Sequence, residues 1–170
     1  MARFFVIMGV SGCGKTTIGE ALAAYLGCPF YDGDDFHSPQ NVAKMAAGIP
    51  LNDGDRAPWL DTLAALIQEH LDREETAVLA SSALKKRYRD RLRVDGRVQF
   101  IFLDGDFDLI WERMQARQDH YMKAEMLRSQ FDALEAPGEE EAIRVPIDQS
   151  VNDILAQILL ALQTEGGSAS

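Results

Sequence analysis

The sequence has few cysteines, no long apolar run and a deficit of positive charge. Cys13 and Cys28 are its only cysteines, which excludes a disulfide framework and predicts a reducing, cytoplasmic location. No apolar run approaches the roughly 20 residues that a membrane-spanning helix requires, so we expect no membrane partner. Basic residues number 17 against 27 acidic ones, a net charge of −10, which predicts that the chain repels nucleic acid. An anionic ligand would therefore need a local pocket of positive charge.

The apolar segments predict an α/β fold. Five runs, apolar along most of their length, are typical of buried parallel strands, and segments of helical period separate them. The predicted strands lie at residues 3–9, 28–34, 76–82, 98–104 and 142–148. The predicted helices lie at residues 16–26, 58–71, 107–117 and 152–162, the second beginning at Pro58. We expect one domain over residues 1–165, an open sandwich with a parallel sheet covered on both faces, and a disordered tail at 166–170.

A phosphate-binding loop follows the first predicted strand. Residues 9–16, "GVSGCGKT", match the P-loop pattern G-x-x-x-x-G-K-[ST] and are called the P-loop below. Successive N–H groups of such a loop, together with the start of the next helix, hold phosphate oxygens. Lys15 would reach the β and γ phosphates of ATP, and the Thr16 hydroxyl would ligate Mg²⁺. The predicted nucleotide contacts are Gly9, Val10, Ser11, Gly12, Cys13, Gly14, Lys15, Thr16 and Thr17.

Acidic residues follow the second predicted strand, where ligands of such sheets bind. Phosphoryl transfer to an alcohol needs one carboxylate for the hydroxyl proton and another that supports Mg²⁺. Asp32 and Asp34 would point the same way if the segment stays extended, and which of them performs which role stays open. An acidic turn with a capping aspartate is the alternative. His37, which follows closely, is expected to contact substrate.

The third predicted strand ends without the acid that many P-loop NTPases use for Mg²⁺, since it reads "AVLASSA". We therefore expect the acid that supports the metal, Asp32 or Asp34, to lie at the end of the second strand, a trait of small kinases of the shikimate and nucleoside-monophosphate type. The basic run "KKRYRDRLR" follows the third strand. Lys85 and Arg89, one helical turn apart, would meet an anionic substrate, and Arg56 would lie over the same cleft.

The segment after the fourth predicted strand resembles a mobile lid over about residues 114–138. Arg113 and Arg117 lie four residues apart and share a helix face, and a polar stretch with His120 follows. Lids of this kind bring arginines onto the phosphates and exclude water. The alternative is that both arginines form surface ion pairs with Glu112 and Asp119.

Taken together, these motifs resemble the gluconate kinase family. The matching stretches are "GVSGCGKT", "DGDDFH-P-N--KM--G-PL-D-DR-PWL", "SALKKRYRD-LR", "R---R--HYM", "L-SQF--LE-P" and "VPID", which span almost the whole chain in order. The resemblance implies a three-layer P-loop kinase fold with a parallel five-stranded sheet and a helical lid, usually dimeric. It also implies transfer of the γ-phosphate of ATP to the 6-hydroxyl of D-gluconate with Mg²⁺.

The resemblance also implies roles for residues. Arg113 would flank the adenine of ATP and Arg117 its phosphates. Asp32 and Asp34 would serve Mg²⁺ and the attacking hydroxyl, with the division between them left open, and Thr16 would ligate Mg²⁺. The implied gluconate contacts are Asp34, His37, Asn41, Lys44, Arg56, Lys85, Arg89, His120 and Gln130.

Two other functions compete with this prediction. A kinase for shikimate or a nucleoside monophosphate would share the P-loop but would lack the "DGDDFH" block. An ATP-binding regulatory protein without transfer activity would need neither the paired aspartates nor the lid arginines.

Overall fold

The computed structural model describes residues 2–116 and 124–168 of the chain. They form one parallel sheet of five strands in the order β2-β3-β1-β4-β5. The strands are β1 (Phe4–Met8), β2 (Phe30–Asp32), β3 (Ala77–Ala80), β4 (Val98–Asp104) and β5 (Ala142–Pro146). The helices are α1 (Lys15–Leu26), α2 (Pro39–Ala46), α3 (Asp53–Asp72), α4 (Lys86–Leu92), α5 (Phe107–Ala116), α6 (Ala124–Ala133) and α7 (Val151–Ser168), with a short 3₁₀ helix η1 (Gly33–Phe36). The predicted parallel five-stranded sheet is confirmed.

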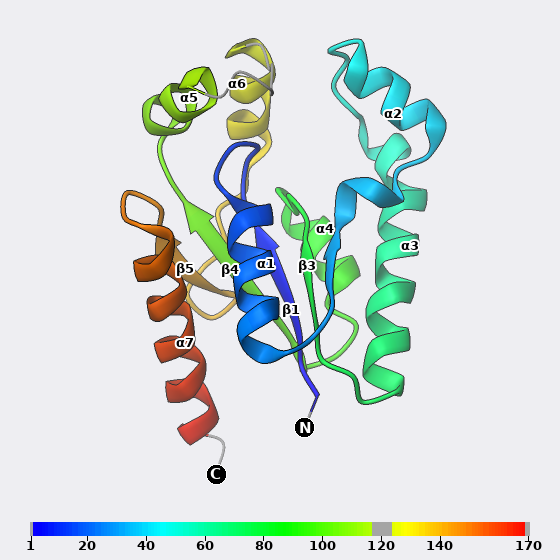
Figure 1. Ribbon diagram of the computed structural model, residues 1–170. Helices are drawn as coiled ribbons and strands as arrows, with labels where there is room; N and C mark the ends of the chain where they lie inside the picture. Colours follow the sequence, from blue (N-terminus) through cyan, green and yellow to red (C-terminus); the bar gives the residue numbers. More distant parts are fainter. Residues whose placement is uncertain (1, 117–123, 169–170) are drawn as a thin grey trace.

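Helices cover both faces of the sheet, which explains why its strands are apolar without alternation (Figure 1). Successive side chains of β1 point to opposite faces. Phe4, Val6 and Met8 pack with α3 and α4, whereas Phe5 and Ile7 pack with α1, α5 and α7. Every residue of β1 is buried. The central strand therefore holds the P-loop, which follows it directly, on a rigid base.

Helix α3 begins five residues earlier than predicted, at Asp53 rather than Pro58. The Asn52 side chain accepts a hydrogen bond from the Asp55 N–H, and the Asp55 side chain accepts one from the Asn52 N–H. This reciprocal cap satisfies two donors at the helix start. Pro58 lies inside the helix, where it lacks only the N–H that would bond the Gly54 carbonyl. The helix therefore starts at the capping pair and not at the proline.

At the other end of the chain, helix α7 extends to Ser168, three residues into the predicted disordered tail. The structure thus describes residues 166–168 as helix, and residues 169–170 lie outside the described part. Among the described helices, none is long and apolar enough to cross a membrane. The single domain over residues 1–165 and the lid over 114–138 stay predictions.

Candidate active site

The carboxyl ends of the strands open into a cleft of about 800 Å³, called the main cleft below. Its walls come from the P-loop, the segment after β2, the residues between α2 and α3, the loop after β3, and α6. The predicted site residues that line it are Ser11, Gly12, Gly14, Lys15, Thr16, Thr17, Asp32, Asp34, His37, Arg56, Lys85 and Gln130. Residues predicted from five separate segments therefore meet in one place.

The P-loop wraps around its own lysine. Lys15 Nζ donates to the carbonyl oxygens of Gly9 and Val10, each at 3.0 Å. Gly14, with φ of 99°, is the residue before α1, and this left-handed conformation favours glycine. Since α1 begins at Lys15, the N–H groups of its first turn have no partner within the helix and are free for an anion.

Asp32 and Asp34 both reach the main cleft, but the segment between them does not stay extended. The chain turns into η1 after Asp32, whose Oδ1 accepts the N–H of Asp34 at 3.0 Å. This bond holds Asp32 in place. Asp34 remains exposed to the cleft. Desolvation by the surrounding protein raises the pKa of its carboxyl, and the negative charge of Asp32 raises this pKa further. The positive charge of Lys15 opposes both effects.

His37 is held rigidly at the edge of the main cleft. Its ring stacks on Trp59 with the centroids 4.3 Å apart, and Trp59 Nε1 donates to the Gly33 carbonyl at 2.7 Å. Burial lowers the pKa of His37, although Asp34 raises it. The Asn41 amide nitrogen lies 3.2 Å from His37 Nδ1 and can only donate. The ring proton therefore lies on Nε2, which is 3.8 Å from Asp34 Oδ1.

Asn41 and Lys44 do not line the main cleft. Asn41 is buried and donates to the Asp55 carbonyl at 2.8 Å. Lys44 Nζ lies 2.9 Å from both carboxylate oxygens of Asp55. Both residues therefore fasten α2 to the start of α3, and their predicted contact with substrate is not supported.

Two predicted cations, Arg56 and Lys85, do line the main cleft. Arg56 Nη1 donates to the Leu51 carbonyl at 2.8 Å, and its guanidinium lies over the Tyr88 ring. Lys85 Nζ lies 3.4 Å from the carboxylate of Asp53, which also accepts from Arg87 and from the Tyr88 hydroxyl. The Tyr88 hydrogen bond, followed by the nearby cations, lowers the pKa of Asp53. Sequence reasoning missed Asp53 at this site, because it lies in the stretch "GIPLNDGDRAPWL", whose many turn-forming residues suggested only a turn.

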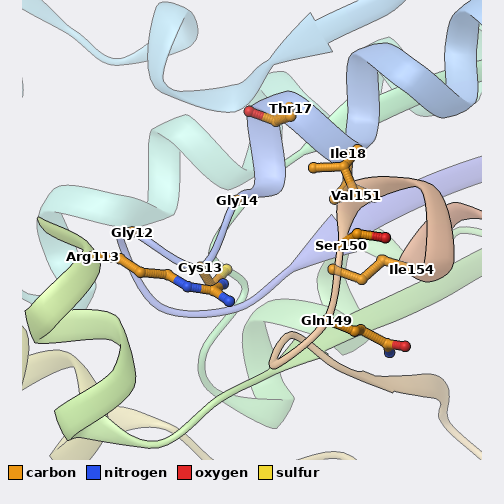
Figure 2. Close-up of a pocket in the computed structure, with 10 residues that line it drawn as sticks. All are labelled: Gly12, Cys13, Gly14, Thr17, Ile18, Arg113, Gln149, Ser150, Val151 and Ile154. Atoms are coloured by element: carbon orange, nitrogen blue, oxygen red, sulfur yellow. The ribbon is translucent and has the colours of Figure 1, made fainter. Parts of the chain in front are cut away.

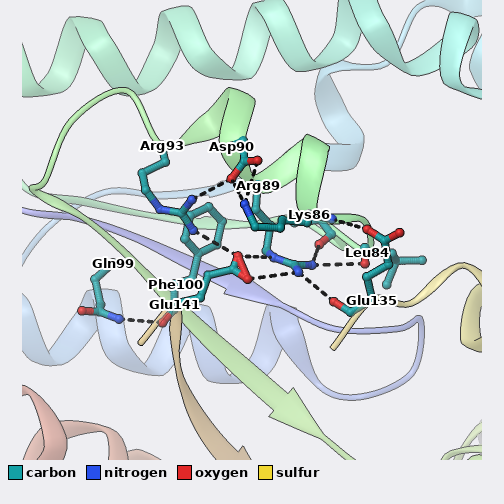
Figure 3. Close-up of polar contacts among 10 residues, drawn as sticks. Leu84, Lys86, Arg89, Asp90, Arg93, Gln99, Phe100, Glu135 and Glu141 are labelled. Atoms are coloured by element: carbon teal, nitrogen blue, oxygen red, sulfur yellow. Dashed lines mark hydrogen bonds and ion pairs between the residues drawn. The ribbon is translucent and has the colours of Figure 1, made fainter. Parts of the chain in front are cut away.

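The prediction that Arg89 contacts substrate is wrong. Its side chain is only 1% exposed and lies on the core side of α4. The guanidinium binds the carboxylate of Glu141 and the carbonyls of Ala83, Leu84 and Glu135 (Figure 3). Spacing of one helical turn placed Arg89 beside Lys85, but Lys85 precedes the helix as its N-cap. The two side chains therefore do not share a face.

A second, smaller cavity of about 320 Å³ lies on the other side of the P-loop (Figure 2). Cys13 and Gly14 line it together with Arg113, whose Nη2 donates to the Ile147 carbonyl at 2.6 Å. The facing wall is the segment after β5, which no prediction included although it follows the carboxyl end of a strand. That segment contributes Gln149, Ser150 and Val151.

The last three predicted site residues belong to the predicted lid. Gln130 on α6 binds Ser11 of the P-loop through two hydrogen bonds. Arg117 and His120 lie outside the described residues.

Residues that could hold a metal ion are few. Among the described residues there is no group of three or more His, Cys, Asp or Glu side chains that could bind one. Thr16 and Asp32 line the same cleft and offer hard oxygen donors. Mg²⁺ commonly takes only one or two protein oxygens, with the remaining positions filled by water and phosphate. The donor set therefore fits Mg²⁺.

Comparison with known proteins places this geometry in a family. The shikimate kinase family model matches residues 11–162. The thermosensitive gluconokinase of Escherichia coli K12 is 45% identical over 156 residues, which cover 90% of this chain and 83% of the relative.

Solved structures agree with the sequence comparison. A gluconokinase from Sinorhizobium meliloti 1021 superposes with a TM-score of 0.91 at 39% identity, covering 98% of this chain and 95% of that one. Shikimate kinase from Aquifex aeolicus shares the fold, with a TM-score of 0.63, but only 16% of its residues are identical. The chain is therefore a kinase that belongs to the gluconokinases, within the wider family that the shikimate kinase model describes.

Proposed function

We propose that the protein transfers the γ-phosphate of ATP to the 6-hydroxyl of D-gluconate and gives 6-phospho-D-gluconate. The observation that carries this proposal is the meeting of three features in one cleft. These are the P-loop, the Asp32 and Asp34 pair, and a cationic wall that contains Arg56 and Lys85. The gluconokinases that resemble the chain over most of its length support gluconate as the acceptor.

The triphosphate would lie along the P-loop, with its oxygens on the N–H groups at the start of α1. Lys15 would leave the Gly9 and Val10 carbonyls and turn to the β and γ phosphates. The smaller cavity would take the adenine ring, with the Arg113 guanidinium against its face and the segment after β5 beneath it. Mg²⁺, held by Thr16 and through water by Asp32, would neutralise the developing phosphate charge.

The acceptor would lie between the P-loop and the start of α3. Its carboxylate would meet Lys85 and Arg56, which supply charge in an otherwise acidic protein. Asp32 is fixed by its bond to the Asp34 amide, whereas the Asp34 side chain is exposed to the cleft. We therefore assign Asp34 as the group that accepts the proton of the attacking hydroxyl, and Asp32 as the support of Mg²⁺. His37 Nε2 would orient Asp34 or an acceptor hydroxyl.

Three further features are proposed on weaker support. The lid over residues 114–138, with Arg117 on the phosphates and His120 near the acceptor, rests on the family resemblance. A homodimer rests on the same resemblance. A cytoplasmic location is consistent with Cys13 and Cys28, which are both free thiols.

A panel of acceptors tests the proposal. ADP formation from ATP and Mg²⁺ would be followed with D-gluconate, shikimate and nucleoside monophosphates, each over a range of concentrations. We expect saturable turnover with gluconate, and a kcat/KM at least about 100-fold lower with the others, since an acceptor of different shape leaves hydrogen-bonding groups of the site unpaired. Absence of turnover with gluconate, or preference for shikimate, would refute the assignment.

A further inference from the structure

A glutamine of helix α6 is hydrogen-bonded to the P-loop. Gln130 Oε1 accepts the backbone N–H of Ser11 at 2.6 Å, and Gln130 Nε2 donates to Ser11 Oγ at 2.8 Å. The two residues are 119 positions apart in the sequence. Figure 1 shows α6 above the loop that joins β1 to α1. One primary amide thus binds the backbone N–H and the side-chain hydroxyl of one residue, which fixes the direction of the Ser11 N–H.

This contact divides the P-loop into two halves. In the first half the protein satisfies the polar groups itself, since Gln130 takes the Ser11 N–H and Lys15 takes the Gly9 and Val10 carbonyls. The Cys13 N–H is bonded to the Val10 carbonyl at 3.3 Å, and the N–H groups that follow lie at the free end of α1, where they can bind an anion. The bond from Gln130 to Ser11 therefore holds the part of the loop that leads into the phosphate-binding N–H groups.

We propose that Gln130 is a positioning residue that holds the P-loop in its phosphate-binding shape and makes ATP affinity depend on the placement of α6. This inference rests on the proposed function only in taking ATP as the nucleotide. It revises the role that the family resemblance implied for Gln130, which was contact with gluconate. Each end of its amide already makes one hydrogen bond to Ser11, so a sugar acid would find only the second amide hydrogen and the second lone pair of the oxygen.

Nucleotide binding without any acceptor tests the proposal directly. Titration calorimetry with a non-hydrolysable ATP analogue and Mg²⁺ would compare the wild type with Gln130→Ala, Ser11→Ala and the double variant. We expect Gln130→Ala to weaken binding about three- to tenfold, in keeping with the loss of two hydrogen bonds of ordinary strength. Ser11→Ala keeps the N–H bond and is expected to have a smaller effect. The double variant is expected to bind like Gln130→Ala, because both changes break the same contact.

Gln68→Ala is the matched control. Gln68 lies on the exposed side of α3 and donates to Asp72 at 2.8 Å, so its loss removes a glutamine hydrogen bond far from the P-loop. We expect analogue binding by this variant to equal that of the wild type. Kinetics would add a second readout. Gln130→Ala is expected to raise the KM for ATP while the KM for gluconate stays within about twofold, as expected for a change in uniform binding of one substrate.

Three results would overturn the proposal. Analogue binding by Gln130→Ala could equal that of the wild type while only its thermal midpoint falls, which would assign a purely structural contact. The KM for gluconate alone could rise, which would make Gln130 an acceptor ligand. The effects of Gln130→Ala and Ser11→Ala could add, which would show that the residues act independently. Because the binding assay contains no acceptor, a failure of gluconate turnover would refute the proposed function and leave this test intact.

Discussion

The guanidinium of Arg89 and the carboxylate of Glu141 form a two-point ion pair inside the protein. Nε lies 2.9 Å from Oε2, and Nη2 lies 3.2 Å from Oε1. Arg93 adds a third contact to the same carboxylate. Arg89 also holds the carbonyl of Glu135, which follows α6 (Figure 3). The pair thus joins α4, the end of α6 and the start of β5, which is a structural task rather than a catalytic one.

We expect Arg89→Met to lower the free energy of unfolding by about 3 kcal/mol, because removal of one partner of a buried pair leaves charge and carbonyl groups unsatisfied. Urea denaturation measures this loss. Arg91→Met is the control, because Arg91 and Asp61 form an exposed pair, and such pairs contribute at most about 1 kcal/mol. Under conditions where Arg89→Met is folded, we expect its KM for gluconate to match that of the wild type. A large rise in that KM would restore Arg89 as a substrate ligand.

The raised pKa of Asp34 predicts the pH dependence of the reaction. Asp34 must be ionised to accept a proton, so kcat/KM is expected to fall as the pH drops through its folded pKa. Because that pKa is raised, the fall should begin at a higher pH than for an ordinary aspartate. Asp34→Asn should abolish turnover and keep ATP binding. An acid limb that lies at or below the ordinary aspartate range would contradict the assignment.

The stability of the protein provides a second check on the raised pKa of Asp34. A carboxyl whose pKa is raised by folding holds its proton more tightly in the folded state, so its ionised form disfavours folding at pH values above both pKa values. We therefore expect Asp34→Asn to raise the thermal midpoint at neutral pH. The difference should shrink as the pH is lowered into the range where Asp34 is protonated in both states. A lower midpoint for Asp34→Asn would show that the carboxylate stabilises the fold.

The sequence alone was sufficient to predict those parts of the fold and the site whose pattern lies within a few consecutive residues. The P-loop pattern lies within eight consecutive residues, and the apolar strands on either side of the site carry their own signature. The acids after β2 were found because parallel strands present their carboxyl ends at one edge of the sheet. Even there, the extended segment expected between Asp32 and Asp34 is a 3₁₀ turn.

Distant partners explain most of what the sequence did not reveal. The role of Arg89 depends on Glu141, which is 52 residues away, and the role of Gln130 depends on Ser11. Lys44 carries the charge that a substrate pocket requires, but Asp55 binds it. Residue type alone does not tell whether a cation meets a ligand or a carboxylate of the protein itself. The partner of each cation depends on how helices and strands pack against one another, and a single sequence does not show this packing.

The two cysteines should differ in their reaction with alkylating reagents. Cys13 is 3% exposed within the P-loop, and burial raises the pKa of its thiol against the opposing effect of Lys15. Cys28 is partly exposed, although burial raises its pKa as well. Since the thiolate is the reactive form, we expect Cys28 to be labelled first and Cys13 slowly. Mass spectrometry of labelled peptides measures both rates, and ATP should protect Cys13 alone. Faster labelling of Cys13 would contradict its burial.

Lys85 and Arg87 form a matched pair for testing the acceptor site. Both contact the carboxylate of Asp53, but only Lys85 lines the main cleft. We expect Lys85→Met to raise the KM for gluconate about 10- to 100-fold, because a hydrogen bond to a charged group contributes about 1.5–3 kcal/mol. Its KM for ATP should change little. Arg87→Met removes an equal charge from the same carboxylate and should leave both KM values near those of the wild type. Equal effects of the two variants would mean that net charge, rather than a direct contact of Lys85, determines how the acceptor is bound.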